Sequence, residues 1–213
     1  MSLRLPGGQG RPQNCGGKEV QPMEFLDVVD ENGVPTGAQV ERARAHAEGV
    51  RHRTAHVWLV RHKAGRLQVL LQKRSAEKDS FPGCYDISSA GHIPAGVEYL
   101  PSALRELREE LGVMAAAQQL VYCGQRSFFY EGTFHGRPFR DRQVSNIYLL
   151  WLDREPRQFT LQAEEVSEVR WFDFDACVQS VEQNTIPHCI YAEELYMVRR
   201  AAEQRPAAKG ETV

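Results

Sequence analysis

The sequence predicts an α/β fold, arranged as an α/β/α sandwich with a mixed central sheet. Short stretches rich in β-branched and aromatic residues recur along the chain, as they do in strands. Helical patterns interrupt these stretches, one in the middle of the chain and two near its end. Strands and helices that alternate in this way pack as a sheet covered by helices on both faces.

The expected elements follow one another with turn signals between them. Strands are expected at residues 25–29, 55–60, 67–72, 85–88, 120–130, 144–152 and 166–172. Turns and loops are expected at residues 30–33, 63–65, 81–83 and 91–96, where glycine or proline occurs. Pro101 is expected to open the central helix, because proline is tolerated in the first helical turn. Two further helices are expected at residues 173–183 and 191–203.

The bulk properties indicate one domain, at residues 23–205 of the 213. Residues 1–22 are interrupted by glycine and proline, so a disordered or irregular segment is expected there, and a flexible tail at 206–213. A net charge of -2 argues against a nucleic-acid polymer as partner. The chain shows no apolar run that could span a membrane and no signal-peptide pattern. Five cysteines without a Cys-x-x-Cys pair fit free thiols in the cytoplasm.

The central helix carries the most informative pattern. Glu106, Glu109 and Glu110 are spaced i, i+3 and i+4, so their carboxylates share one helix face. Leu107 and Leu111 belong to an apolar stripe that anchors the helix on a core. Neighbouring like charges repel by about 0.2–0.5 kcal/mol per exposed pair. Hard divalent cations bind such clusters of oxygen atoms, so the face is interpreted as a metal site rather than as a solvated surface.

The same stretch resembles the signature of the Nudix hydrolase superfamily. The positions that match are Gly91, Arg105, Glu106, Leu107, Glu109, Glu110, Gly112 and Val113. One position departs from the signature, since Val97 stands where the family has its first Glu, with Glu98 beside it. The resemblance implies a Nudix-type sandwich and hydrolysis of a diphosphate linkage with Mg²⁺ or Mn²⁺.

The resemblance also implies roles for particular residues. Metal ligands are expected to be Glu106, Glu109, Glu110 and the backbone carbonyl of Gly91, and catalytic residues Arg105, Glu106, Glu109, Glu110 and Glu165. Glu165 precedes Trp171 by the spacing at which many Nudix enzymes place a further glutamate, and Glu164 is the neighbouring candidate. Glu106 and Glu165 are alternative acceptors for the proton of the attacking water.

Residues outside the signature are expected to contact the substrate. His52 and His92 are assigned to substrate binding, and so are Lys73 and Arg74, which follow a core strand. The basic stretch around His46 and His52 has two interpretations, because clustered histidines suit a second metal and clustered cations suit phosphates. His56 lies within a strand, where a packed residue is expected. The aromatic residues Phe128, Phe129, Tyr130 and Phe139 are candidates for stacking on a base, although core packing is the commoner role.

Residues 25–203 also resemble the isopentenyl-diphosphate isomerases, a branch of the superfamily. His46, His52 and His92 lie close to the positions through which isomerases bind a metal. The isomerase acid and base are missing, however, because Ala90 replaces a Cys and Asp141 and Gln143 replace a Glu-x-Glu pair. Neither an alanine nor a glutamine amide transfers protons near neutral pH. The pattern therefore favours a hydrolase in an isomerase-like frame.

The predicted function is Mg²⁺- or Mn²⁺-dependent hydrolysis of a nucleoside diphosphate derivative or another small phosphorylated metabolite. Two alternatives stay open: an isopentenyl-diphosphate isomerase, and a nucleotide-sensing module without catalysis, which the substitution at Val97 would favour. A homodimer is compatible with the resemblance, because dimers are common in the family.

Overall fold

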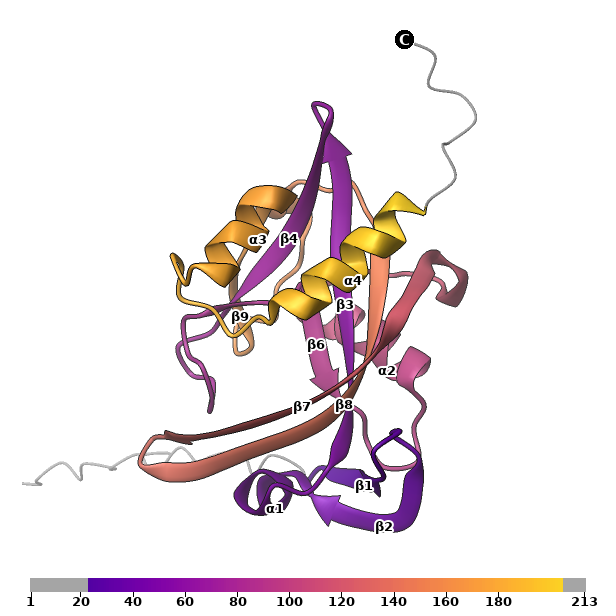
Figure 1. Ribbon diagram of the computed structural model, residues 1–213, viewed down its shortest axis with the longest axis vertical. Coiled ribbons are helices and arrows are strands. Elements are labelled where there is room, and N and C mark those ends of the chain that lie inside the picture. Colours follow the sequence, from indigo (N-terminus) through magenta and orange to yellow (C-terminus); the bar gives the residue numbers. More distant parts are fainter. Residues whose placement is uncertain (1–22, 205–213) are drawn as a thin grey trace, which may run out of the picture.

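A computed structural model describes residues 23–204 of the chain, which form two sheets and four α-helices (Figure 1). The strands are β1 (Phe25–Val29), β2 (Pro35–Glu41), β3 (His52–Lys63), β4 (Arg66–Arg74), β5 (Tyr85–Asp86), β6 (Ser89–His92), β7 (Leu120–Phe134), β8 (Arg137–Trp151) and β9 (Val166–Asp173). The helices are α1 (Arg42–Glu48), α2 (Tyr99–Leu111), α3 (Phe174–Glu182) and α4 (Ala192–Glu203), with 3-10 turns at Ala117–Gln119 and Pro156–Gln158. The expectations for residues 1–22 and 206–213 lie outside the described residues.

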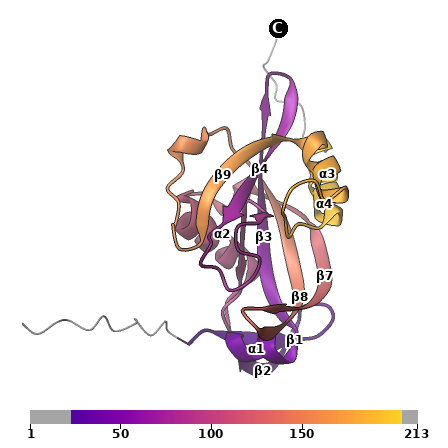
Figure 2. The same ribbon diagram turned by 90° about the vertical axis from the view of Figure 1, so that its left-hand side faces the viewer.

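The large sheet is mixed, as predicted. Its strands run in the order β5-β4-β3-β8-β7, and β6 and β9 pair with β3 and β4. Only the β3–β8 pairing is parallel among the described strands, and the other pairings are antiparallel. One face of the sheet is covered by α2 and the other by α3 and α4 (Figure 2). The α/β/α sandwich expected from the sequence is therefore confirmed.

Strand β3 runs through the centre of both cores. Side chains alternate between the faces of a strand, so Val57 and Leu59 pack toward α2, whereas Trp58 and Val60 pack toward α3 and α4. All four side chains are fully buried. This two-sided burial explains why residues 55–60 form an almost continuous apolar run in the sequence.

A smaller layer lies at one end of the sandwich and consists of the β1–β2 hairpin and α1 (Figure 1). It is joined to the sheet by a buried ion pair, in which Arg53 Nη2 on β3 donates to Asp27 Oδ2 on β1 at 2.8 Å. The same Arg53 nitrogen donates to the carbonyl of Val97 at 2.8 Å. One arginine therefore connects the small layer, the central strand and the segment that leads into α2.

Three of these elements, α1, β2 and β6, were not predicted, and β6 takes up the first two residues of the loop expected at 91–96. In α1 only Ala45 is buried, so its sequence lacks the apolar period of a helix that packs along its length. In β2 only Val40 is buried, so no alternating pattern marks it as a strand. Strands β7 and β8 are longer than expected and form a hairpin arm that continues beyond the sheet to Phe134 and Arg137 (Figure 1).

Helix α2 is close to its expected position, and its end depends on one glycine. Gly112 has φ +63°, and its N–H bonds back to the carbonyl of Arg108 at 3.1 Å. A Cβ atom at this position would lie 2.7 Å from Cβ of Thr160. A larger residue would thus be both strained and obstructed at this helix end. Among residues 23–204, no helix is long and apolar enough to cross a membrane.

The anchoring of α2 can be tested through Leu107, which is fully buried. Leu107→Ala should lower the free energy of unfolding by about 2–5 kcal/mol, because it removes buried methyl groups and leaves a cavity. Met114→Ala is the control, since Met114 is 77% exposed and should change stability by less than about 0.5 kcal/mol. Urea denaturation measures both variants, and equal effects would contradict the packing described for α2.

Candidate active site and metal centre

An open cavity of about 2000 Å³ lies beside the amino-terminal part of the sheet's central strand. It is bounded by α2, by the loop of residues 75–84, by the β7–β8 arm and by the start of α4. The carboxylates of Glu106, Glu109 and Glu110 line its α2 side, together with Gly91 of β6. The three glutamates that the sequence places on one helix face therefore face a common space.

The three carboxylates differ in exposure. Glu110 is 5% exposed, and one of its carboxylate oxygens accepts a hydrogen bond from the backbone N–H of Ala90 at 3.3 Å. The side chain of Glu106 is 13% exposed, whereas that of Glu109 is 40% exposed. The group thus reaches from the protein interior to the cavity, as a site that takes up a cation from solvent requires.

Arg105 holds two of these carboxylates in place. Its Nη2 donates to Glu106 Oε1 at 2.6 Å and its Nη1 to Glu109 Oε2 at 3.0 Å. The same Nη2 also donates to the backbone carbonyl of His92 at 3.2 Å. The guanidinium fork therefore fixes the helix face against the end of β6, and Arg105 is a positioning residue in this structure.

Gly91 leaves room beside β6 for the Glu106 side chain of α2. A Cβ atom at this position would lie 2.1 Å from Cδ of Glu106. Any side chain would therefore displace the Glu106 carboxylate from the cluster. This contact gives a physical reason for the glycine that begins the signature in the sequence.

The crowding and burial of the carboxylates raise the pKa values of Glu106 and Glu110. Burial, together with the neighbouring charge of Glu109, raises the pKa of Glu106 from 4.5 to about 7 despite the opposing effect of Arg105. Burial and the charge of Glu106 raise the pKa of Glu110 from 4.5 to about 8. A divalent cation would relieve both effects, because it neutralises the charge that burial penalises. The donor set is all oxygen, which is the set that Mg²⁺ and Mn²⁺ prefer.

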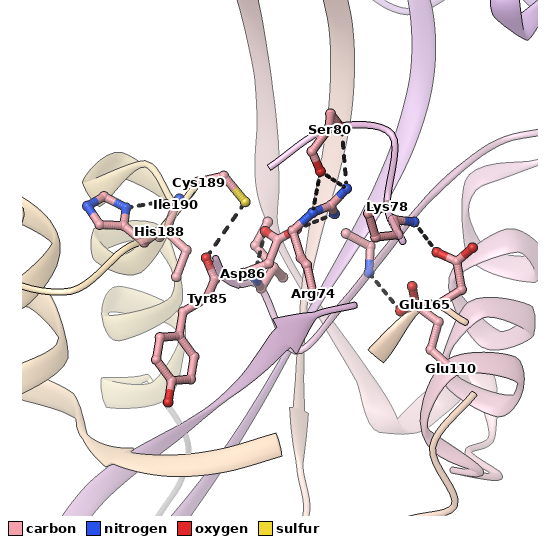
Figure 3. Close-up of polar contacts among 12 residues, drawn as sticks. Arg74, Lys78, Ser80, Tyr85, Asp86, Glu110, Glu165, His188, Cys189 and Ile190 are labelled. Carbon is pink, nitrogen blue, oxygen red and sulfur yellow. Dashed lines mark hydrogen bonds and ion pairs between the residues drawn. The ribbon is translucent and has the colours of Figure 1, made fainter. Parts of the chain in front are cut away.

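Glu165 joins this cluster from the segment before β9. It lines the cavity, and its charge contributes to the raised pKa values of Glu106 and Glu110. Its carboxylate contacts the ammonium group of Lys78, and Figure 3 shows this pair beside Glu110. Lys78 thus brings a positive charge to the acidic wall.

The departure at Val97 is not compensated by its neighbour. Val97 packs partly buried against the core on the α2 side, and Glu98 is the residue before the first turn of α2. The Glu98 side chain is 79% exposed, and its nearest charged partner is Arg53 at 3.9 Å. Glu98 is not among the described residues that line the cavity.

A second candidate cation site lies on the neighbouring wall. Nitrogen atoms of His46 from α1, His52 from β3 and His92 from β6 all lie within 4.8 Å of one another. His52 is fully buried, and its Nδ1 bonds the carbonyl of Val50 at 2.9 Å. Its Nε2 has no hydrogen-bond partner, and neither does Oδ1 of Asp141, which lies 3.4 Å away.

The protonation of this histidine cluster suits metal binding. Because His52 Nδ1 donates to a carbonyl, its Nε2 is the ring nitrogen that faces the cluster. Burial lowers the pKa of His46 to about 4 and that of His92 well below its ordinary value, so both imidazoles are neutral near pH 7. The ring nitrogens of the three histidines and the Asp141 carboxylate together form a donor set for a transition-metal cation such as Zn²⁺ or Mn²⁺.

The substrate-binding residues expected from the sequence have different positions. His92 lines the cavity, whereas His52 lies behind it and reaches the site only through the histidine cluster. Arg74 lines the cavity, but its guanidinium is occupied by Asp86 Oδ2 at 2.9 Å and by the carbonyl of Ser80 (Figure 3). Lys73 is not among the described residues that line the cavity.

The aromatic candidates also separate into two groups. Phe128, Tyr130 and Phe139 line the cavity, and Phe139 stacks on His46 at 4.7 Å between ring centroids. Phe129 points the other way and is 55% exposed. Alternation along β7 explains the difference between neighbours.

A mixed sheet between helices, with an acidic helix face and a close glycine beside an open cavity, is the arrangement of a hydrolase that acts on diphosphate bonds. Residues 50–193 match the family model described as NUDIX domain. The chain therefore belongs to the Nudix family.

Relatives of known sequence agree with this assignment. Nudix hydrolase 3 of Arabidopsis thaliana is 41% identical over 156 residues, which are 71% of this chain but 19% of that protein. The uncharacterized Nudix hydrolase YfcD of Escherichia coli K12 is 30% identical over 181 residues, 85% of this chain and 91% of the relative. The chain thus spans about a fifth of the plant protein and most of the bacterial one.

Solved structures share the fold at lower identity. DR0079 from Deinococcus radiodurans has a TM-score of 0.59 and 20% identity, covering 84% of this chain and 99% of that one. The NUDIX domain of Shewanella oneidensis NrtR, complexed with ADP ribose, has a TM-score of 0.50 and 18% identity, covering 71% and 86%. These likenesses support the fold.

The contact at Gly91 leads to a first prediction about the site. Gly91→Ala should weaken Mn²⁺ binding at least about tenfold, because the added methyl group pushes Glu106 away from its neighbours. Isothermal titration calorimetry measures the affinity, and circular dichroism confirms that the variant is folded. Unchanged affinity in a folded variant would contradict the role of Gly91 and Glu106 in holding the cation.

A second prediction concerns pH. Because the pKa values of Glu106 and Glu110 are raised to about 7 and about 8, the folded protein binds more protons than the unfolded chain above about pH 4.5. The free energy of unfolding of the metal-free protein should therefore fall as the pH rises from about 5 to about 8. The double variant Glu106→Gln/Glu110→Gln should show a flatter dependence in urea denaturation. An equally steep dependence would show that these carboxyl groups are not the cause.

Proposed function

We propose that this chain hydrolyses a diphosphate linkage in a small phosphorylated metabolite, with Mg²⁺ or Mn²⁺ as cofactor. The observation that carries the proposal is the convergence of Glu106, Glu109, Glu110 and Glu165 on one cavity. Nucleoside diphosphate derivatives are the substrate class to examine first. ADP ribose, which is bound by the structural neighbour NrtR, is one compound of this kind.

The chain's residues divide the work of such a reaction. Glu106, Glu109, Glu110 and the Gly91 carbonyl would hold the cation, which when bound neutralises phosphate oxygens and lowers the pKa of a water molecule. Arg105 donates hydrogen bonds to Glu106 and Glu109 and so keeps these two carboxylates in position. Glu106 and Glu165 are the two candidates that receive the proton of the attacking water. Positioning and charge neutralisation account for most of the rate in phosphoryl transfer.

Isomerisation of an isoprenoid diphosphate is a second candidate, and the histidine cluster of His46, His52 and His92 favours it. The acid–base chemistry speaks against it. Ala90 lines the cavity without a titratable group, and the Gln143 amide donates to Asp141 at 2.6 Å. We therefore propose that the chain is a hydrolase whose fold and histidine positions resemble those of the isomerase branch.

We further propose a cytoplasmic location, which the free thiols of Cys84, Cys123, Cys177 and Cys189 support. A homodimer stays a prediction, and light scattering of the purified protein would test it.

Glu110→Gln tests the proposed hydrolysis, because it removes a buried ligand charge while preserving the shape of the side chain. Turnover of the best diphosphate substrate at saturating Mg²⁺ should fall by more than about tenfold, or about 1.4 kcal/mol in activation free energy. Glu98→Gln is the matched control at the exposed residue just before the same helix, and it should retain activity within about twofold. Equal activity of the two variants would refute the metal assignment.

The choice between reactions needs its own experiment. The wild-type protein is incubated with isopentenyl diphosphate, and separately with a panel of diphosphates that includes ADP ribose. Released inorganic phosphate, or monophosphates formed by cleavage of the diphosphate linkage, support the hydrolase. Dimethylallyl diphosphate, in which that linkage is intact, supports the isomerase. If a nucleotide raises the melting temperature without any turnover across the panel, the chain is a binding module instead.

A further inference from the structure

The loop of residues 75–84, which connects β4 to β5, places a positive charge against the acidic wall of the cavity. The acidic wall is the group of carboxylates on Glu106, Glu109, Glu110 and Glu165. The ammonium group of Lys78 contacts Oε2 of Glu165, and the Lys78 side chain is 17% exposed. Figure 3 shows this ion pair beside Glu110. The cation and water steps assigned to the glutamates give Lys78 no part, so its charge needs its own explanation.

Glu165 is fixed by the backbone and not by Lys78. Its carbonyl accepts a hydrogen bond from the N–H of Ser75 at 2.9 Å, and its own N–H donates to the carbonyl of Gln162 at 2.9 Å. The N–H of Gln162 in turn donates to the carbonyl of Glu110 at 3.1 Å. The segment that carries Glu165 is therefore bound both to the end of α2 and to the start of the loop. The Lys78 side chain can consequently move without moving Glu165.

The loop is also held by contacts other than the ammonium group of Lys78. The Arg74 guanidinium donates to the carbonyl of Ser80 at 2.8 Å, which fixes the middle of the loop to β4 (Figure 3). The ring of Phe81 lies 5.0 Å from the ring of Tyr130 on the β7–β8 arm, measured between centroids. The ion pair is thus not needed to hold the loop in place, and its main effect on the site is electrostatic.

The charge of Lys78 acts on more of the site than its partner. Burial and the charge of Glu106 raise the pKa of Glu110, and the charge of Lys78 acts in the opposite direction. Lys78 also adds to the lowering of the pKa of His92, of which burial is the main cause. The ammonium group therefore acts on the α2 face and on the end of β6, where the divalent cation would be held. Two cations attracted by the same carboxylates repel each other, and burial of the Lys78 side chain limits the screening of this repulsion.

We propose that Lys78 is an internal counter-cation that competes with the divalent cation for the acidic wall. It neutralises Glu165 when no divalent cation is bound, and it leaves Glu165 when one binds. The wall then carries a compensating positive charge in both states, which limits repulsion among its carboxylates. Lys78 is a positioning residue, since it acts through the carboxylates and not on the substrate. This inference deepens the proposed function and rests on it, because the divalent cation is the cofactor of the proposed hydrolysis.

Lys78→Met tests the competition, because methionine keeps much of the length of the side chain and removes the charge. Mg²⁺ is titrated into the wild type and the variant by isothermal titration calorimetry at about pH 8.5, where the carboxylates are largely deprotonated. The dissociation constant for Mg²⁺ should be at least about fivefold lower in the variant, because the competing charge is gone. An equal or weaker affinity of the folded variant for Mg²⁺ would overturn the proposal.

Two further variants identify the charge as the cause. Lys78→Arg keeps a positive charge at the same position and should bind Mg²⁺ within about twofold of the wild type. Lys63→Met is the matched control, because it removes the lysine of another ion pair, with Glu155, that is not among the described residues lining the cavity. It should bind Mg²⁺ as the wild type does. If Lys78→Arg bound Mg²⁺ as tightly as Lys78→Met, the shape of the side chain and not its charge would be the cause, and the competition would be refuted.

A second measurement follows the Lys78 side chain directly. Its ¹³Cε resonance is assigned by its loss in Lys78→Arg and is recorded by NMR while Mg²⁺ is added to the wild type. The resonance should shift in proportion to the occupancy of the cation site, whereas that of Lys63 should stay where it is. A Lys78 resonance that does not move while Mg²⁺ binds would show that the ion pair with Glu165 persists, and would contradict the displacement.

The outcomes separate this inference from the proposed function, and none of them depends on turnover. If the wild type binds Mg²⁺ and Lys78→Met binds it no more tightly, the competition fails while the cation site and the proposed hydrolysis stand. If neither the wild type nor Lys78→Met binds Mg²⁺ up to high millimolar concentration, the cation site itself fails, and both proposals fail with it.

Discussion

The site depends on the crowding of buried carboxylates where α2 meets β6. Glu106 and Glu110 are held close together with little solvent, and burial together with mutual repulsion raises both pKa values. Arg105 compensates part of this charge, and the absence of a side chain at Gly91 provides the space. The charged form of these carboxylates is unfavourable without a counter-ion and becomes favourable when a divalent cation binds. This gain in cation binding is the physical basis of the proposed chemistry.

The rest of the fold places other chemical groups around that cluster. Arg53 ties the small β1–β2 layer and α1 to the sheet, and α1 thereby brings His46 to His52 and His92. The β7–β8 arm and the start of α4 close the opposite side with Arg126, Tyr191 and Glu194. The cavity consequently has an acidic wall, an imidazole wall and a wall that carries the Arg126–Glu194 ion pair.

Much of this could be predicted from the sequence, and the reasons are local. The acidic face of α2 follows from helical spacing, and the strands of the sandwich core follow from runs of apolar residues such as 55–60. The role of Arg105 as a clamp on Glu109 also follows from i to i+4 spacing, which the structure confirms. The layered architecture follows from the alternation of elements, whereas the strand order, with its parallel β3–β8 pair, depends on pairing between distant segments.

Other features depend on contacts between residues far apart in the chain. The α1 helix has only one buried residue, and the network around Glu194 joins side chains from β3, β7 and α4. The sequence around a single histidine in a strand, such as His56, does not show whether the side chain is packed in the core or contacts a buried carboxylate beside a cavity. Likewise, the exposure of Glu98 depends on the entry into α2, so its inability to replace the signature glutamate appears only in three dimensions.

The most direct measurement of the central claim is anomalous diffraction from crystals soaked in Mn²⁺ with a phosphorylated ligand. The carboxylate cluster predicts an anomalous peak within coordination distance, about 2.1–2.3 Å, of oxygen atoms from Glu106 and Glu110. A peak at the histidine cluster would be additional to it. Crystals with full ligand occupancy and no anomalous density beside α2 would contradict the account.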